Sequence, residues 1–208
     1  MLYVADVAVK CPDCGIKFVS KQLPLLLDTG CRNSELRQDF KGSMPQMEHY
    51  AVATCPSCGK ADWSVSFQPI DEQALLSQAD MATHLQFRSA AIGAERRGRD
   101  FYNIGLLYLH AAWCADDVLA APQAREYRKL AADAFRKAIV DVSCPVDQRP
   151  EIEYLIGELL RRAGEFEVAR SYFNQVLPHL PSRFALMARR LIRLCESGNS
   201  EAIDFDFG

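Results

Sequence analysis

The sequence predicts an α+β fold that is mainly α, with a small β domain first and a bundle of antiparallel helices after it. Two features predict the small β domain. A five-residue motif with two cysteines occurs twice near the N-terminus, and short segments with the pattern of β-strands lie between the two copies. The second part is predicted by apolar residues that follow helical spacing from about residue 70 onward. We therefore expect a β domain over residues 1–69, a helical domain over 70–195 and a disordered acidic tail over 196–208.

The composition is that of an ordinary globular protein of 208 residues, with 49% hydrophobic and 25% charged residues. No apolar run approaches the roughly 18 residues of a membrane span, and Asp6 interrupts the short apolar N-terminus, so we expect a cytoplasmic location. In that reducing compartment, eight cysteines indicate metal or redox chemistry rather than disulfides. The net charge is −3, and residues 1–70 carry seven basic and seven acidic side chains, which counts against a nucleic-acid partner.

The repeated cysteine frame is CPDCG at residues 11–15 and CPSCG at residues 55–59. In each copy, two thiolates can reach one metal ion if the backbone turns tightly between them, and the proline and the glycine favour such a turn. Two turns of this kind, one from each of two hairpins, place four sulfur atoms around a tetrahedral Zn²⁺. The sequence therefore predicts a zinc ribbon whose metal ligands are Cys11, Cys14, Cys55 and Cys58.

Redox and catalytic interpretations of these cysteines are less favoured. A thiol–disulfide motif uses one C-x-x-C pair beside alternating strands and helices, whereas this chain has two pairs and no such alternation around either. A catalytic zinc ion keeps one position open for water, but four thiolates fill the coordination shell. We therefore expect a structural zinc ion, which would stabilise a domain of about seventy residues that is marginal without one.

Between the two cysteine pairs, residues 18–28 and 49–55 have the pattern of short β-strands, separated by a polar loop that contains Cys31. Phe18 and Trp63 follow their cysteine pairs by four or five residues, and we expect them to form a small apolar core behind the metal. Cys31 is interpreted as a small side chain, with a spare thiol near the metal and a reactive thiol as the alternatives.

The helical domain contains a segment that fits the tetratricopeptide repeat pattern, from Pro150 to Pro181. Gly157 and Ala169 are small where two antiparallel helices would approach each other, and Phe173 would fill the space between them. An earlier copy begins at Phe101 and contains about fourteen extra residues, so its two helices should be longer and join near residues 121–122. A tetratricopeptide-like antiparallel helical bundle is therefore expected, closed by a last helix from residue 182.

Stacked helix pairs of this kind form a concave face suited to peptides. We expect the inner-helix residues Asn103, Glu153 and Arg161 to line this face and to bind a protein or peptide partner. Two arginine clusters, at residues 96–99 and 189–193, supply an alternative, in which they and the ribbon bind nucleic acid. The phenylalanines of the tail sequence DFDFG could dock into a groove of the same protein.

The two CPxCG frames, about forty residues apart and followed by tetratricopeptide-like helices, resemble a bacterial family of uncharacterised proteins, domain-of-unknown-function family 2225. The resemblance extends from Cys11 to about Pro181. It departs from the family before the second cysteine pair, where the family carries an aspartate-rich motif, and at Lys60, where the family has a tyrosine. The resemblance implies a bacterial cytoplasmic protein and brings no activity or catalytic residues with it.

The favoured function is that of a non-enzymatic, zinc-binding adaptor or scaffold protein that binds a protein or peptide through its helical repeats. Nucleic-acid binding is the alternative. An enzyme is the third choice, because the sequence shows no nucleophile–base set, no phosphate-binding glycine loop and no open metal site.

Overall fold

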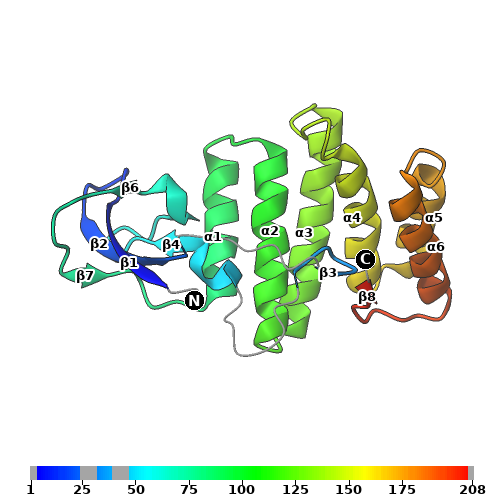
Figure 1. Cartoon of the computed structure of the whole chain (residues 1–208), viewed down its shortest axis with the longest axis horizontal. Helices are drawn as coiled ribbons and strands as arrows, with labels where there is room; N and C mark the ends of the chain where they lie inside the picture. The colour runs from blue at the N-terminus through cyan, green and yellow to red at the C-terminus, as the bar shows by residue number, and fades with distance from the viewer. Residues whose placement is uncertain (1–3, 24–31, 39–46, 206–208) are drawn as a thin grey trace. The chain divides into compact units, whose positions relative to one another are not determined.

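The computed structural model describes residues 4–23, 32–38 and 47–205, so Cys31 lies outside the described residues. The chain divides into two units. The first, which we call the cysteine unit, comprises Met1–Asp28 and Phe40–Arg99. The second, the helical unit, comprises Thr29–Asp39 and Asp100–Gly208, so a short piece of the loop between the cysteine pairs belongs to the helical unit. The α+β, mainly α class is confirmed (Figure 1).

Each cysteine pair of the cysteine unit lies at the turn of a β-hairpin, as predicted. Strand β1 (Ala5–Lys10) pairs antiparallel with β2 (Lys17–Gln22), and β4 (Val52–Thr54) pairs antiparallel with β5 (Ala61–Trp63). Two short strands extend the first hairpin into a four-stranded sheet of order β6-β1-β2-β7, namely β6 (Gln68–Pro69) and β7 (Leu76–Ser77). Two 3-10 turns, at Met47–Tyr50 and Ser64–Ser66, complete the connections.

A small apolar core lies behind the cysteines. Phe18 is fully buried and meets Phe67 edge to face, with ring centroids 5.4 Å apart. Val9, Ala53 and the sulfur-bearing Cys11 and Cys55 complete this cluster. The expectation for Phe18 is confirmed, whereas Trp63 is only half-buried and packs on Phe87 of the following helix instead, at 5.6 Å.

Helix α1 (Thr83–Arg96) belongs to the cysteine unit, so the units divide at Arg99 and Asp100 rather than at the predicted residue 69. The reason is a set of polar contacts that a periodicity argument does not detect. The carboxylate of Asp62 in β5 is almost completely buried and forms ion pairs with Arg97 and Arg99 just after the helix, at 3.2 and 3.1 Å. Because both partners of this buried charge directly follow α1, the helix is tied to the cysteine unit.

The helical unit contains five helices among its described residues, and each packs on the next (Figure 1). Helix α2 begins at Phe101, where the Asp100 carboxylate accepts a hydrogen bond from the Asn103 amide as an N-cap. The turn between the first two helices lies at residues 118–120, close to the predicted junction. The helices are α2 (Phe101–Asp117), α3 (Ala121–Val140), α4 (Arg149–Arg162), α5 (Phe166–Val176) and α6 (Ser182–Glu196).

The close helix approaches predicted from the repeat pattern are confirmed. A Cβ atom added to Gly157 would lie 2.4 Å from the ring of Phe173, and one added to Gly105 would lie 2.5 Å from the ring of Phe135. The two helix pairs therefore use the same device, in which a glycine on the first helix accepts a phenylalanine ring from the second.

The substitution Gly157→Ala is expected to lower the free energy of unfolding by about 1–3 kcal/mol, because the new methyl group would overlap a fully buried ring. The gain of about 1 kcal/mol in helix propensity does not offset this. Urea unfolding followed by circular dichroism measures the effect. Gly93→Ala in α1 is the matched control, since the nearest atoms to its methyl group would be those of the Arg97 guanidinium, at 3.0 Å, rather than a fully buried ring, and it should cost less stability than Gly157→Ala. A Gly157→Ala protein as stable as the wild type would refute the close approach.

Two segments outside the helix pairs dock on the helical unit. The first is residues 32–38, which we call the inserted segment, and the second is residues 199–205, the C-terminal segment. Strand β3 (Arg32–Asn33) of the first pairs antiparallel with β8 (Asp204–Phe205) of the second, and Figure 1 shows the two strands together beside α4. The tail was expected to be disordered from residue 196, but it is ordered as far as residue 205 because the inserted segment pairs with it.

Candidate functional sites

The two cysteine turns have the same backbone geometry. In the first, the Gly15 amide donates to the Cys11 carbonyl at 2.9 Å, and in the second the Gly59 amide donates to the Cys55 carbonyl at 3.1 Å. Both glycines adopt left-handed backbone angles, with φ of 75° and 73°, as predicted from their position after each pair. The first cysteine of each pair also donates its amide across the turn, to Ile16 and Lys60 respectively. The hairpins therefore present their thiols in equivalent ways.

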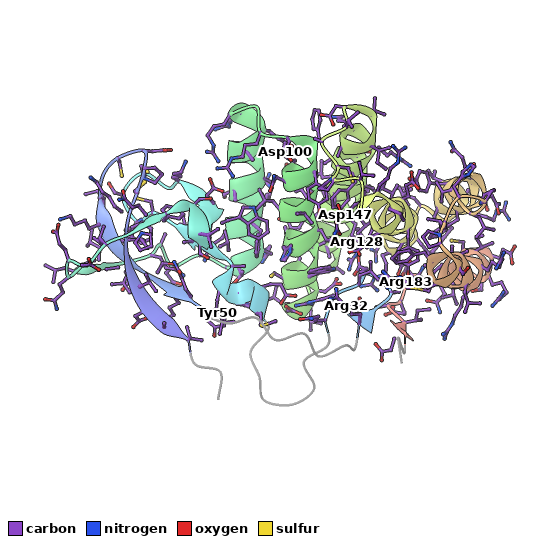
Figure 2. All side chains as sticks on the ribbon, turned by 45° about the horizontal axis from the view of Figure 1, so that its top comes forward. Arg32, Tyr50, Asp100, Arg128, Asp147 and Arg183 are labelled. Carbon is purple, nitrogen blue, oxygen red and sulfur yellow. The ribbon has the colours of Figure 1, made fainter. Side chains whose placement is uncertain are left out.

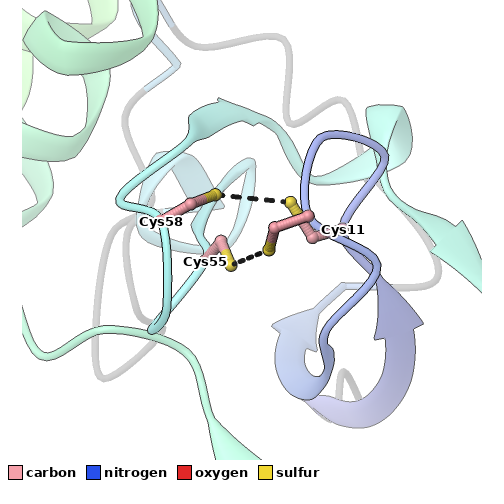
Figure 3. A group of neighbouring side chains, drawn as sticks. Cys11, Cys55 and Cys58 are labelled. Atoms are coloured by element: carbon pink, nitrogen blue, oxygen red, sulfur yellow. Dashed lines mark hydrogen bonds between the residues drawn. The ribbon is translucent and has the colours of Figure 1, made fainter.

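The four sulfur atoms of the two turns converge (Figure 3). Cys11 Sγ lies 3.7 Å from Cys58 Sγ, Cys14 Sγ lies 3.6 Å from Cys55 Sγ, and all four atoms lie within 4.8 Å of one another. Sulfur ligands of a tetrahedral ion with metal–sulfur bonds of about 2.3 Å are about 3.8 Å apart. The donor set and its spacing therefore fit one metal ion held by four thiolates.

Burial differs between the two members of each pair. Cys11 and Cys55 are buried, whereas Cys14 and Cys58 are exposed. The Ile16 amide donates to the Cys14 sulfur and lowers the pKa of that thiol to about 7. Desolvation raises the pKa of Cys11. The turn amides thus stabilise a thiolate at Cys14, and a bound cation would draw the remaining protons off the cluster.

A salt bridge links the two cysteine turns to each other. Lys60, directly after the second turn, lies 2.9 Å from the carboxylate of Asp13, the middle residue of the first, and the Lys60 side chain is only 7% exposed. The salt bridge holds the turns together from outside the sulfur cluster.

The three residues expected to line a partner-binding face do not do so together. Arg161 is fully buried, which corrects its expected place on an open surface: its guanidinium forms two 2.7 Å hydrogen bonds with the buried carboxylate of Glu158. Asn103 is half-buried and its side-chain amide is bound to the capping carboxylate of Asp100. Glu153 is half-buried and pairs with Arg149 on its own helix. Arg161 is therefore used in the fold, and a partner-binding role of Asn103 and Glu153 stays a prediction.

The inserted segment places a carboxylate in the middle of the helical unit. Glu35 is 1% exposed and receives two 2.7 Å hydrogen bonds from Arg128 of α3, which is itself 2% exposed (Figure 2 labels Arg128). Arg162 of α4 lies 3.4 Å from the same carboxylate, and both arginines also reach Asp116 of α2. Desolvation alone would raise the pKa of Glu35, but the charge and hydrogen bonds of Arg128 outweigh it and lower the pKa to about 2.

This depressed pKa predicts an acid-sensitive fold. A carboxylate whose folded pKa is below its unfolded value stabilises the protein above the unfolded pKa, and that stability is lost as the pH falls through the folded pKa. For Glu35 the window runs from about 4.5 down to about 2, with about 3 kcal/mol at stake. Urea unfolding between pH 6 and about 3 should show a steep loss in the wild type and a flatter one in Glu35→Gln. If the stability of the wild type and that of Glu35→Gln fell in parallel with pH, the fold would not stabilise the charged form of Glu35.

The helical unit also binds the backbone of its own chain. The Tyr154 hydroxyl donates to the Ser34 carbonyl at 2.8 Å. Arg161 donates to the carbonyls of Asn199 and Glu201, the second at 2.8 Å, and Arg162 donates to that of Ser200 at 2.9 Å. Each of these bonds depends on the main chain and not on the identity of the bound side chain.

An open pocket of about 580 Å³ lies beside the C-terminal segment. Its lining includes exposed Arg125, near the start of α3, together with buried Arg128 and partly buried Arg162. The remaining lining comes from the α2–α3 turn and the C-terminal segment, including Asp116, Leu119, Ala121, Ser200, Glu201 and Ala202.

Sequence reasoning missed Glu35, Arg128 and Arg162. One signal was present for Arg128, which falls on the buried stripe formed by Ala124, Ala131 and Phe135. A charged residue on such a stripe needs a partner. Nothing in the polar sequence around Glu35 identifies it as that partner.

The arginines that follow α1 were expected to be a solvated or nucleic-acid-binding cluster. Arg97 and Arg99 instead neutralise buried Asp62. Arg96 is exposed and lines a second pocket of about 460 Å³, together with Cys58, Lys60 and Arg97.

No helix among the described residues is both long and apolar enough to cross a membrane.

Comparisons with known proteins identify the family. Neither the curated proteins nor the solved structures contain a match to the chain. A family model described as an uncharacterized protein conserved in bacteria, domain-of-unknown-function family 2225, matches residues 76–193, from β7 to the last turns of α6 and after both cysteine pairs. The match covers more than half of the chain, which therefore belongs to this bacterial family.

Proposed function

We propose that this chain is a non-enzymatic, cytoplasmic adaptor protein in which a zinc ion stabilises the cysteine unit and tetratricopeptide-like helices bind a segment of a partner protein. The observation that carries the proposal is the way the helical unit already holds polypeptide. Arg161, Arg162 and Tyr154 donate hydrogen bonds to four main-chain carbonyls of two segments that are remote from them in sequence. A face that binds backbone in this way accepts segments of many sequences.

Zinc is the metal that the donor set favours. Four thiolates in a tetrahedral arrangement are typical of structural zinc sites, and they leave no coordination position for water. When bound, the ion would cross-link the two hairpins. It would not act as a Lewis acid toward a substrate. The residues that would hold it are Cys11, Cys14, Cys55 and Cys58.

The pocket beside the C-terminal segment is the place where a partner segment would first contact the helical unit. Arg125 is exposed there, close to the uncapped N-terminus of α3, and its charge favours a segment with acidic side chains. The C-terminal segment forms part of the pocket wall, so a partner would lie alongside polypeptide that is already docked.

The full-length protein, used as bait in an extract of its native bacterium, tests this proposal. Arg125→Glu should reduce capture of the specific partner about tenfold or more, because it reverses the one exposed arginine among the residues that line the pocket. Arg88→Glu makes the same charge change at an exposed position of α1 and should leave capture of the partner unchanged. Equal loss in both variants, or in neither, would contradict binding at this pocket.

Nucleic-acid binding stays as the second candidate, and the pocket beside the second cysteine turn is what favours it. Lys60, Arg96 and Arg97 line that pocket. Lys60 and Arg97 are already paired with Asp13 and Asp62, which leaves less positive charge for phosphates. Salt-dependent binding of RNA or DNA that is lost in Arg96→Glu would support this candidate over the first.

A further inference from the structure

The inserted segment is held by the helical unit as a ligand is held. It comes from the loop between the cysteine pairs, more than sixty residues before α2, yet it belongs to the helical unit. Its four central residues, Ser34 to Arg37, are all buried. Their contacts with the helices include hydrogen bonds and ion pairs to α2, α3 and α4. An equivalent segment from another molecule could form all of these contacts.

Recognition of the segment depends on two charges of opposite sign, two positions apart. Glu35 lies between Arg128 and Arg162. Arg37 forms two hydrogen bonds with the carboxylate of Asp117, at 2.8 and 2.7 Å, and a third with the Trp113 carbonyl at 3.2 Å. Fork-to-fork pairs of this kind fix both the charge and the orientation of a bound group.

The segment is also preorganised as a tight turn. The side-chain oxygen of Asn33 accepts hydrogen bonds from the amides of Glu35 and Arg37, at 2.9 and 3.1 Å. Leu36 adopts a left-handed backbone, with φ of 61°. This turn directs the carboxylate of Glu35 and the guanidinium of Arg37 toward different helices, and a ligand without it would have to be ordered on binding.

We propose that the helical unit recognises a Glu-x-Arg turn in its partner protein, and that the chain's own inserted segment occupies the same site as an intramolecular competitor. The inference rests on the proposed function and specifies the chemistry of the partner segment. A partner turn would place its glutamate between Arg128 and Arg162 and its arginine on Asp117. When a partner turn replaces the inserted segment, Arg128, Arg162 and Asp117 each regain an equivalent charged partner. No buried charge of the helices is therefore left unpaired.

Competition with a tethered segment sets the expected strength of binding. A segment on the same chain has an effective concentration in the millimolar range, so a free partner binds weakly while the inserted segment is docked. The apparent affinity rises in proportion to the fraction of molecules whose site is open. Weakening the inserted segment should therefore strengthen binding of a Glu-x-Arg turn supplied by another molecule.

A labelled synthetic peptide of residues 29–41, with serine in place of Cys31, tests this on the full-length protein. Arg37→Ala is the sensitised variant, since it keeps the buried Glu35–Arg128 pair and leaves Asp117 with a partly exposed carboxylate. The peptide should bind Arg37→Ala at least tenfold more tightly than the wild type, by fluorescence anisotropy. A peptide with glutamine at the Glu35 position and alanine at the Arg37 position should bind neither protein. If Arg37→Ala loses its helical circular dichroism, Ser34→Ala replaces it as the sensitised variant.

Three results would overturn the inference. The first is a folded sensitised variant that binds the peptide no better than the wild type does. The second is equal binding of the altered peptide. The third is concentration-dependent dimerisation of the sensitised variant that the peptide suppresses, which would make a second copy of the chain the occupant. If the peptide fails while Arg125-dependent capture of a partner persists, this inference is wrong and the proposed function stands. Failure of both experiments rejects the proposed function as well.

Discussion

Removal of the metal by a strong chelator is expected to unfold the cysteine unit and to leave the five helices of the helical unit folded. The apolar cluster that lies directly behind the cysteines is small, with Val9, Phe18, Ala53 and Phe67 besides two of the cysteines. A core of this size contributes little stability by itself, whereas structural zinc sites contribute about 10–16 kcal/mol of apparent binding energy.

Nuclear magnetic resonance of the full-length protein measures this effect residue by residue. Amide signals of β1, β2, β4, β5 and α1 should collapse toward random-coil positions, while those of α2–α6 stay dispersed. The ligand substitution Cys55→Ser should act like the chelator. Cys144→Ser, at a buried cysteine of the helical unit that is not part of the sulfur cluster, should keep the cysteine unit folded. A cysteine unit that stays folded without metal would refute a structural role for the ion.

The substitution Glu35→Ala is expected to destabilise the helical unit by about 3–5 kcal/mol. Arg128 would lose the two 2.7 Å bonds that it forms with Glu35, and a 2%-exposed guanidinium would depend on Asp116 alone. The inserted segment would also lose its central contact, so strands β3 and β8 should separate. The midpoint of urea unfolding, followed by helical circular dichroism, measures the loss.

Glu167→Ala is the matched control for this prediction. Glu167 pairs with Arg170 on the surface of α5, and its side chain is 80% exposed. Exposed pairs contribute about 0–1 kcal/mol, so the control should behave almost as the wild type does. Equal effects of the two substitutions would show that burial of the Glu35–Arg128 pair has no energetic consequence.

The features that could be predicted from sequence are those set by local spacing. Each cysteine pair lies within five residues together with the proline and glycine that shape its turn, so the turn geometry was predictable. The approach of Phe173 to Gly157 was likewise predictable, because the repeat pattern specifies both positions. Strand β2 (Lys17–Gln22) overlaps the first part of the β run expected at residues 18–28, and residues 24–28 of that run lie outside the described residues.

The features that could not be predicted depend on polar partners far apart in the chain. Arg161 and Arg162 have the sequence pattern of a solvated helix end, yet they bind the C-terminal segment about forty residues later. Asp62 and Arg99 decide that α1 belongs to the cysteine unit, although the helical periodicity of α1 suggested the opposite. Strand pairing between residues 32–33 and 204–205 is set by tertiary contacts, and neither segment has a strand pattern of its own.

X-ray absorption at the zinc edge, combined with elemental analysis of the purified full-length protein, tests the central claim most directly. We expect one zinc ion per chain, with four sulfur neighbours at about 2.3 Å and no nitrogen or oxygen neighbour. Replacing both Cys11 and Cys55 by serine should abolish the signal, because each hairpin would lose one of its two sulfur ligands. A shell that contains water or nitrogen, or zinc content unchanged by these substitutions, would contradict a closed structural site formed by the two cysteine turns.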